Sequence, residues 1–198
     1  WSDENKATPK TSAVSPAEAT DVLEAALKNA ESVICFCISD QMSSTGNVLR
    51  LAVQELEAED KVFVVDSKNL STGIGLQIIE AAILAEQDMD AKDIVEKISN
   101  ITPRVRASFV VDTLTYLHRG GRCSGLAALA GGALKLHPLI SVIDGKMLPG
   151  KKYRGKMNRV LIEYVKDMEE ELKLAKADRV FITHSGCDEE TIRAVEDY

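Results

Sequence analysis

Three short apolar segments, each separated from the next by residues with helical spacing, constrain the fold of this chain most. They are SVICFCI at 32–38, KVFVVD at 61–66 and ASFVVD at 107–112. Short segments that are apolar throughout are typical of strands buried on both faces of a sheet. Between them, Val48 and Leu51 belong to an amphipathic helical pattern. The alternation predicts an α/β fold with a parallel sheet, whose loops after the strands meet at one edge.

The remaining elements follow from local signals. Ser15 can cap a helix whose capping box is completed by Glu18, and the pair Asp144-Gly145 predicts a tight hairpin turn. We expect a Rossmann-like α/β domain over 1–104 and a second α/β domain over 105–198. The other expected elements are helices near 74–87, 91–100, 126–134 and 156–175, a helix from 189, and a strand at 179–183.

Composition narrows the function classes. The 198 residues carry a formal net charge of −7, which argues against a nucleic-acid binder, because phosphate neutralisation needs clustered Lys and Arg. No run of about 18 apolar residues is present, so we expect at most transient membrane contact. The four cysteines show no CxxC spacing and fit free thiols in a reducing compartment, so we expect a cytoplasmic location.

The sequence lacks the common catalytic and cofactor motifs. It has three histidines but no HExxH pair, no GxSxG nucleophile turn and no complete GxGxxG or GxxxxGK[ST] loop. We therefore expect no metal, no cofactor and no catalytic residue of its own, and we look instead for a binding site.

Two hydroxyl-rich loops precede predicted helices. Ser39–Gly46 holds three serines and a threonine, and Lys10–Pro16 holds Thr11, Ser12 and Ser15. Hydroxyls and free N–H groups at the start of a helix can bind an anion, although a single hydroxyl can equally well cap the helix. Both uses stay open, since one hydroxyl can cap while its neighbour faces a ligand.

Three other stretches are candidates for anion or partner binding. The turn Arg119–Arg122 presents two guanidinium groups, and Lys151–Lys156 is the densest basic run in an acidic chain. Either can instead be a solvated surface. The loop Ser67–Gly75 follows a strand and opens a helix, as a phosphate-binding loop does, but its glycines also suit close helix–sheet packing.

Taken in order, these segments resemble the DegV family of bacterial fatty-acid-binding proteins. The strongest match is FVVDTLxYLxxGGR over 109–122. The hydroxyl loops resemble the family's TSQPSP and ISSxLSGT motifs, with Ala13-Val14 for Gln-Pro, Asp40 for Ser, Ser44 for Gly and Gly46 for Tyr. Further matches are the DS…G.G loop at 66–75, PLI and DGK at 138–146, Arg154-Gly155 and HSG at 184–186.

The resemblance implies a two-domain α/β protein that buries a long-chain fatty acid. In the family, hydroxyls hold the carboxylate, and those positions are Thr11 and Ser43 here, with Ser44 beside them and Arg122 near the head group. The family also presents its acyl group to the ATP-binding subunit of a fatty-acid kinase, which Arg154 would face. The family's first strand and closing segment have no counterpart, so we expect a chain truncated at both ends.

Two other readings stay open. One is a Rossmann-like enzyme that acts on a phosphorylated small molecule through the loop Ser67–Gly75. The other is an interaction module that docks through Lys151–Lys156. The leading expectation is a lipid-binding subunit, with a separate kinase as its partner and a fatty acid as its ligand.

Overall fold

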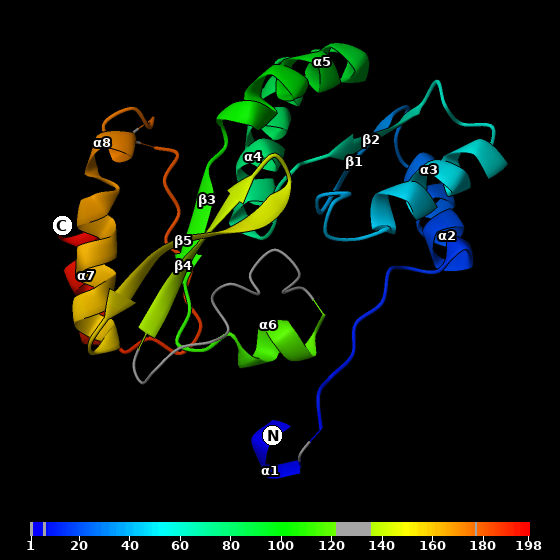
Figure 1. Cartoon of the computed structure of the whole chain (residues 1–198). Helices are drawn as coiled ribbons and strands as arrows, with labels where there is room; N and C mark the ends of the chain where they lie inside the picture. The colour runs from blue at the N-terminus through cyan, green and yellow to red at the C-terminus, as the bar shows by residue number, and fades with distance from the viewer. Residues whose placement is uncertain (1, 6, 122–135, 177) are drawn as a thin grey trace. The chain divides into compact units, whose positions relative to one another are not determined.

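The structure, a computed structural model, describes residues 2–5, 7–121, 136–176 and 178–198. They form two compact units (Figure 1). The N-terminal unit comprises Pro9–Ala107 and the turn Val142–Lys146. The C-terminal unit comprises the described residues of Trp1–Thr8, Ser108–Ser141 and Met147–Tyr198. The division into domains at 1–104 and 105–198 stays a prediction.

A parallel pair of strands forms the centre of the N-terminal unit. Strand β1 (Val33–Cys37) pairs with β2 (Val62–Asp66), and Cys37 lies opposite Asp66 at the carboxyl ends of both. The predicted α/β architecture with a parallel sheet is confirmed. The unit's helices are α2 (Pro16–Leu27), α3 (Thr45–Glu55), α4 (Thr72–Ala85) and α5 (Ala91–Ile101), followed by the 3-10 turn η1 (Thr102–Arg104).

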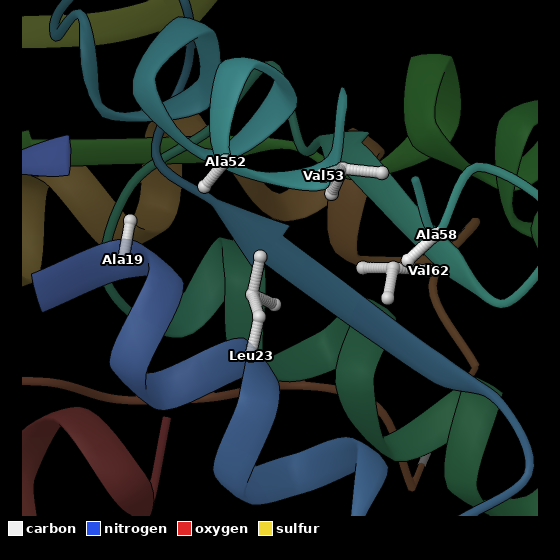
Figure 2. Close-up of a cluster of buried hydrophobic side chains, with 6 residues drawn as sticks. All are labelled: Ala19, Leu23, Ala52, Val53, Ala58 and Val62. Carbon is white, nitrogen blue, oxygen red and sulfur yellow. The ribbon is translucent and has the colours of Figure 1, made fainter. Parts of the chain in front are cut away.

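Both faces of this sheet are covered, which explains why its strands are apolar throughout. Val33 and Cys35 pack with the α2–α3 layer, whose core includes Leu23 (Figure 2). The alternate residues Ile34 and Phe36 pack with α4 and α5 on the opposite side. Because successive strand residues point to opposite faces, a strand between two helical layers needs apolar residues at every position.

Helix α2 begins with the capping box expected from the sequence. The Glu18 N–H donates to Ser15 Oγ at 3.3 Å, and the Ser15 N–H donates to Glu18 Oε2 at 2.9 Å. Pro16 occupies the first helical position, where its missing N–H costs nothing. This start places the chain that carries Thr11 directly before α2.

The C-terminal unit is built on a second sheet with the order β3-β4-β5. Strands β4 and β5 form the predicted hairpin, with Asp144 at φ 48° and Gly145 at φ 78°, the two positive values that a type I′ turn requires. The strands are β3 (Ala107–Val110), β4 (Leu136–Ile143) and β5 (Lys146–Arg154), and the helices are α1 (Ser2–Asn5), α6 (Thr115–Arg119), α7 (Met157–Asp167), α8 (Glu169–Leu172) and α9 (Glu189–Glu196).

Helix α7 is tied to this second sheet by two buried or half-buried tyrosines. Tyr153 on β5 is 1% exposed and its hydroxyl donates to Asp167 at 2.7 Å. Tyr164 on α7 donates to the Ser108 carbonyl on β3 at 2.9 Å, and the two rings meet edge to face. These contacts fix β5, which ends at Arg154, against the helix that follows it.

Two expected elements differ from the structure. The strand predicted at 179–183 is wrong: the segment has no regular structure, and Val180, Phe181 and Ile182 are each about half exposed. A strand needs a neighbouring strand for its backbone groups, and the described residues supply none to this segment. The helix predicted at 156–175 is interrupted at Met168, between α7 and α8.

The helix expected at 126–134 and the candidate Arg122 lie outside the described residues. In the part of the chain that the structure describes, no helix is both long enough and apolar enough to cross a membrane.

Candidate functional site

The carboxyl ends of β1 and β2 lie side by side and release two polar loops at one edge of the sheet. The first loop, 38–44, leads into α3, and the second, 67–71, leads into α4. In open α/β sheets, ligands bind outside the carboxyl ends of the strands. This edge is therefore where a binding site in the N-terminal unit is expected, and the two loops need to be compared atom by atom.

A buried serine fixes the course of the first loop. Ser39 is 0% exposed, and its hydroxyl donates to the Gly145 carbonyl at 2.7 Å. Its own N–H donates to the Asn69 carbonyl at 3.0 Å, while its carbonyl accepts from the N–H groups of Met42 and Ser43 at 2.8 and 3.1 Å. The loop is thus a closed turn, and Ser43 follows it at the start of α3.

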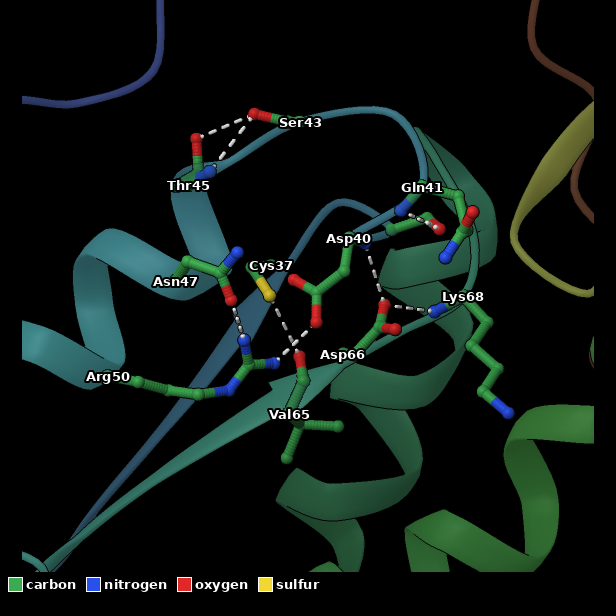
Figure 3. Close-up of polar contacts among 11 residues, drawn as sticks. Cys37, Asp40, Gln41, Ser43, Thr45, Asn47, Arg50, Val65, Asp66 and Lys68 are labelled. Carbon is green, nitrogen blue, oxygen red and sulfur yellow. Dashed lines mark hydrogen bonds and ion pairs between the residues drawn. The ribbon is translucent and has the colours of Figure 1, made fainter.

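Ser43 and Thr45 form a pair of hydroxyls at the N-terminus of α3 (Figure 3). Their side-chain oxygens are 2.9 Å apart, and Ser43 Oγ also accepts from the Thr45 N–H at 3.2 Å. Both residues are half-buried. Because one hydroxyl donates to the other, the pair uses only one of its two protons, and the second can be donated to an anion. The N-terminus of a helix favours negative charge at this position.

Ser44 occupies a different position from its neighbour. It is the N-cap residue of α3, but its side chain makes no capping hydrogen bond and it is exposed. The expectation that a hydroxyl here caps the helix is met by Ser43 instead.

A cluster of charged groups lies behind this hydroxyl pair. Arg50 on α3 donates to Asp40 Oδ2 at 2.6 Å and to Asn47 Oδ1 at 2.8 Å. The hydrogen bond from Arg50 to Asp40 raises the pKa of the guanidinium. Beneath them, burial and then the carboxylates of Asp40 and Asp66 raise the pKa of the Cys37 thiol to about 11. Cys37 is therefore a neutral thiol and not a nucleophile at neutral pH.

The second loop turns its polar side chains inward. Ser67 and Asn69 are 0% and 2% exposed, and Ser67 Oγ accepts from the Asn69 N–H at 3.2 Å. Asn69 Nδ2 donates to the Val105 carbonyl at 3.2 Å. Gln77 Nε2 donates to the Ser67 carbonyl at 2.9 Å. These groups satisfy one another and the backbone, so they are not available to a phosphate group.

The remaining predicted site residues fall in different parts of the chain. Thr11 is exposed in the N-terminal unit, and no hydrogen bond joins it to Ser43 or to any other described residue. Arg154 ends β5 in the C-terminal unit, is exposed, and pairs with no acid among the described residues. Its neighbour Lys151 is bound to Glu163 and Asp167, so the basic stretch is partly neutralised within its own unit.

A second hydroxyl pair was missed by the sequence reasoning. Thr113 and Thr115 at the start of α6 have oxygens 2.7 Å apart, and the Thr115 N–H donates to Thr113 Oγ1 at 3.1 Å. This repeats the geometry of Ser43 and Thr45. The signal that could have found both pairs is two hydroxyl residues separated by one residue immediately before a helix. The Thr113 pair is exposed and starts a helix of five residues.

Comparison with known proteins decides the family. The family described as uncharacterised protein, DegV family, matches residues 2–198. The chain belongs to the DegV family. A DegV domain-containing protein of Deinococcus radiodurans is 37% identical over 163 residues, which cover 81% of this chain and 57% of that protein. The chain thus spans somewhat more than half the length of this DegV relative.

Solved DegV structures share the fold. A stearic acid-binding protein of Eubacterium ventriosum is 29% identical with a TM-score of 0.73, over 86% of this chain and 60% of its own. A fatty-acid-binding DegV protein of Thermus thermophilus is 28% identical with a TM-score of 0.72, over 84% and 57%. The fatty acid kinase B3 protein of Streptococcus pneumoniae, loaded with linoleic acid, is 20% identical with a TM-score of 0.69, over 82% and 57%, and shows likeness of fold alone.

Proposed function

We propose that this protein binds a long-chain fatty acid, holds its carboxylate with the hydroxyls of Thr11 and Ser43, and presents it to a partner kinase. The observation that carries the proposal is the hydroxyl pair of Ser43 and Thr45, half-buried at the start of α3 with one proton to spare. It belongs to a chain of the DegV family, two of whose solved structures at 28–29% identity are described as fatty-acid binding.

The physical chemistry of such a ligand divides the work between tail and head group. Burying an acyl chain contributes about 0.8 kcal/mol per CH₂, so a chain of about 16 carbons gains on the order of 10 kcal/mol. A hydrogen bond to a charged group contributes roughly 1.5–3 kcal/mol, and a buried carboxylate without donors is very costly. The tail therefore provides affinity, and the hydroxyls provide orientation. Ser44 and Arg122 remain candidates beside them.

The ligand class is tested by native and denaturing mass spectrometry on the purified protein. We expect a native mass excess of one long-chain fatty acid that is released on denaturation. The double variant Thr11→Ala/Ser43→Ala should bind stearic acid at least tenfold more weakly while its far-UV circular dichroism is unchanged. Ser99→Ala is the matched control, because its exposed hydroxyl bonds only to the Val95 carbonyl on α5. Equal affinity of the double variant and the control would refute the carboxylate assignment.

The presentation step rests on the chemistry of the head group. Neutral hydroxyls leave a carboxylate oxygen nucleophilic, which suits attack on the γ-phosphate of ATP held by another subunit. Exposed Arg154, which pairs with no acid in the described part of the chain, is suited to face that subunit or the new phosphate. We expect Arg154→Glu to lower acyl-phosphate formation by the kinase subunit about tenfold without changing stearic acid affinity. Lys97→Glu, an exposed charge reversal on α5, is its control.

The second candidate function, an enzyme using the loop Ser67–Gly75 on a phosphorylated small molecule, is disfavoured by the inward course of that loop. Ser67 and Asn69 are buried and bonded within the unit. It would be favoured instead if a nucleotide or sugar phosphate raised the melting temperature and stearic acid did not.

A further inference from the structure

An ion pair between the first loop and α3 encloses the hydroxyl pair. Asp40 lies three residues before Ser43, and Arg50 lies five residues after Thr45. The 2.6 Å contact between Arg50 Nη2 and Asp40 Oδ2 therefore closes a ring of chain that contains both hydroxyls (Figure 3). Arg50 also donates to Asn47 on its own helix, which restricts the guanidinium to one orientation. A planar guanidinium with two fixed acceptors is well suited to hold a loop in place.

The backbone of Asp40 is held from the other side by β2. The N–H groups of Asp40 and Lys68 both donate to Asp66 Oδ1, at 3.2 and 2.9 Å. Asp66 is the last residue of β2, so one carboxylate fixes the starts of both loops to the sheet. Asp40 is thus anchored at its N–H by the sheet and at its side chain by α3, with the hydroxyl pair between the anchors.

The remaining oxygen of Asp40 explains a small residue on α3. Asp40 Oδ1 is buried and has no hydrogen-bond partner. A Cβ at Gly46 would overlap this oxygen and would lie 2.9 Å from Cys37 Sγ. Gly46 does not have a positive φ, so the requirement for glycine is one of space. Asp40 and Gly46 are two of the positions where the chain departs from the ISSxLSGT-type motif, and the structure connects them.

We propose that Asp40 and Arg50 are a positioning pair for the Ser43 hydroxyl, and that Gly46 is small in order to accommodate Asp40. The inference deepens the proposed fatty-acid site and rests on it for its binding readout. Without Arg50, the Asp40 carboxylate loses its cation while Asp66 remains close. The carboxylate then moves outward to water and takes residues 40–44 with it, because an uncompensated charge is costly at a half-buried position.

The test uses the full chain and stearic acid as the probe. Arg50→Met, which keeps the apolar stem and removes the charge, should weaken binding about tenfold. Asp40→Ser/Arg50→Met, which removes both charges, should recover to within about threefold of the wild type. Gly46→Ala, which displaces Asp40 without removing a charge, should weaken binding as Arg50→Met does. Arg104→Met, an exposed arginine on η1 with no bonded acid among the described residues, is the control.

A ligand-independent readout separates this inference from the proposed function. Amide hydrogen exchange of a peptide covering 39–47 should accelerate in Arg50→Met and return towards wild type in the double variant. Wild-type binding with unchanged affinity and exchange in Arg50→Met would overturn the positioning pair and leave the lipid site intact. A wild type that binds no fatty acid would overturn the proposed function, while the exchange data would still decide whether Asp40 and Arg50 hold the loop. A loss of melting temperature alone, without a change in affinity or exchange, would also overturn the positioning pair.

Discussion

The two loops at the carboxyl edge of the β1–β2 sheet have similar composition and placement, but their side chains point in opposite directions. In the first, Ser43 and Thr45 are half-buried at the helix start with a proton to spare. In the second, Ser67 and Asn69 are buried and bonded to neighbouring backbone. A hydroxyl-rich loop before a helix is therefore not sufficient for a site. The packing beneath the loop decides whether its donors face a ligand or stabilise the fold.

The two loops also differ in how they are held. The first is fixed by charged groups, through Asp40 and Arg50. The second is fixed by neutral hydrogen bonds that continue inward through Gln77 to Thr102, whose hydroxyl donates to Gln77 Oε1 at 2.9 Å. Lys68 and Ser71 in the second loop both adopt φ 48°, a conformation that costs energy for residues other than glycine. The interior network offsets this strain, so the second loop should affect stability and the first should affect binding.

The largest expected effect follows from the space under the second loop. Gly73→Ala should lower the free energy of unfolding by about 1–3 kcal/mol, because the added methyl group would overlap the buried Asn69 side chain. A Cβ at Gly75, two residues later in α4, meets nothing within 4 Å, so Gly75→Ala is the matched control and should be neutral or slightly stabilising. Urea unfolding measures both. Equal destabilisation by the two variants would contradict the packing of Asn69 against Gly73.

A pair of serine variants tests the contrast directly. Ser67→Ala leaves the buried Asn69 N–H without its acceptor and should cost about 1–2 kcal/mol of stability. The folded variant should bind stearic acid like the wild type. Ser43→Ala should show the reverse, with a stability change under about 1 kcal/mol and clearly weaker binding. Unfolding curves and ligand titrations on the two proteins are sufficient. Reduced stearic acid affinity in folded Ser67→Ala would mean that both loops contribute to the site.

Features encoded by neighbouring residues could be predicted from the sequence. The Ser15–Glu18 capping box, the Asp144-Gly145 turn and the apolar strands depend on local spacing and conformational preference, and the structure confirms them. The strand expected at 179–183 failed because a strand depends on a partner elsewhere in the chain.

The site divides in the same way. The hydroxyls at the start of α3 could be located from the sequence, because residue type and helix position suffice. The inward course of Ser67 could not, because it depends on Gln77 and Asn69 in the folded unit. The pairing of Asp40 with Arg50 was likewise hidden, since one lies in a loop and the other on a helix ten residues later.

The smallest expected effect reports on the thiol beneath both loops. Cys37 Sγ donates to the Val65 carbonyl at 3.3 Å, and the Cys37 carbonyl accepts from the Ser67 N–H at 3.3 Å. Burial and the nearby carboxylates raise the pKa of Cys37 from 9.0 to about 11. Between those values the unfolded chain loses a proton that the folded chain keeps. The stabilising contribution of this group is therefore complete below pH 9 and is lost as the pH rises to 11.

We expect the loss to be roughly 1 kcal/mol, because partial exposure reduces the value that two pKa units would give. The measurement is the difference in unfolding free energy between the wild type and Cys37→Ala at pH 8.5 and pH 11, with Cys187→Ala as the control thiol. Asp40→Ser should reduce the pH-dependent loss, since it removes one of the carboxylates that raise the pKa, whereas Ser67→Ala should leave it unchanged. If Ser67→Ala reduced the loss and Asp40→Ser did not, the second loop, rather than the charged first loop, would control the environment of the thiol.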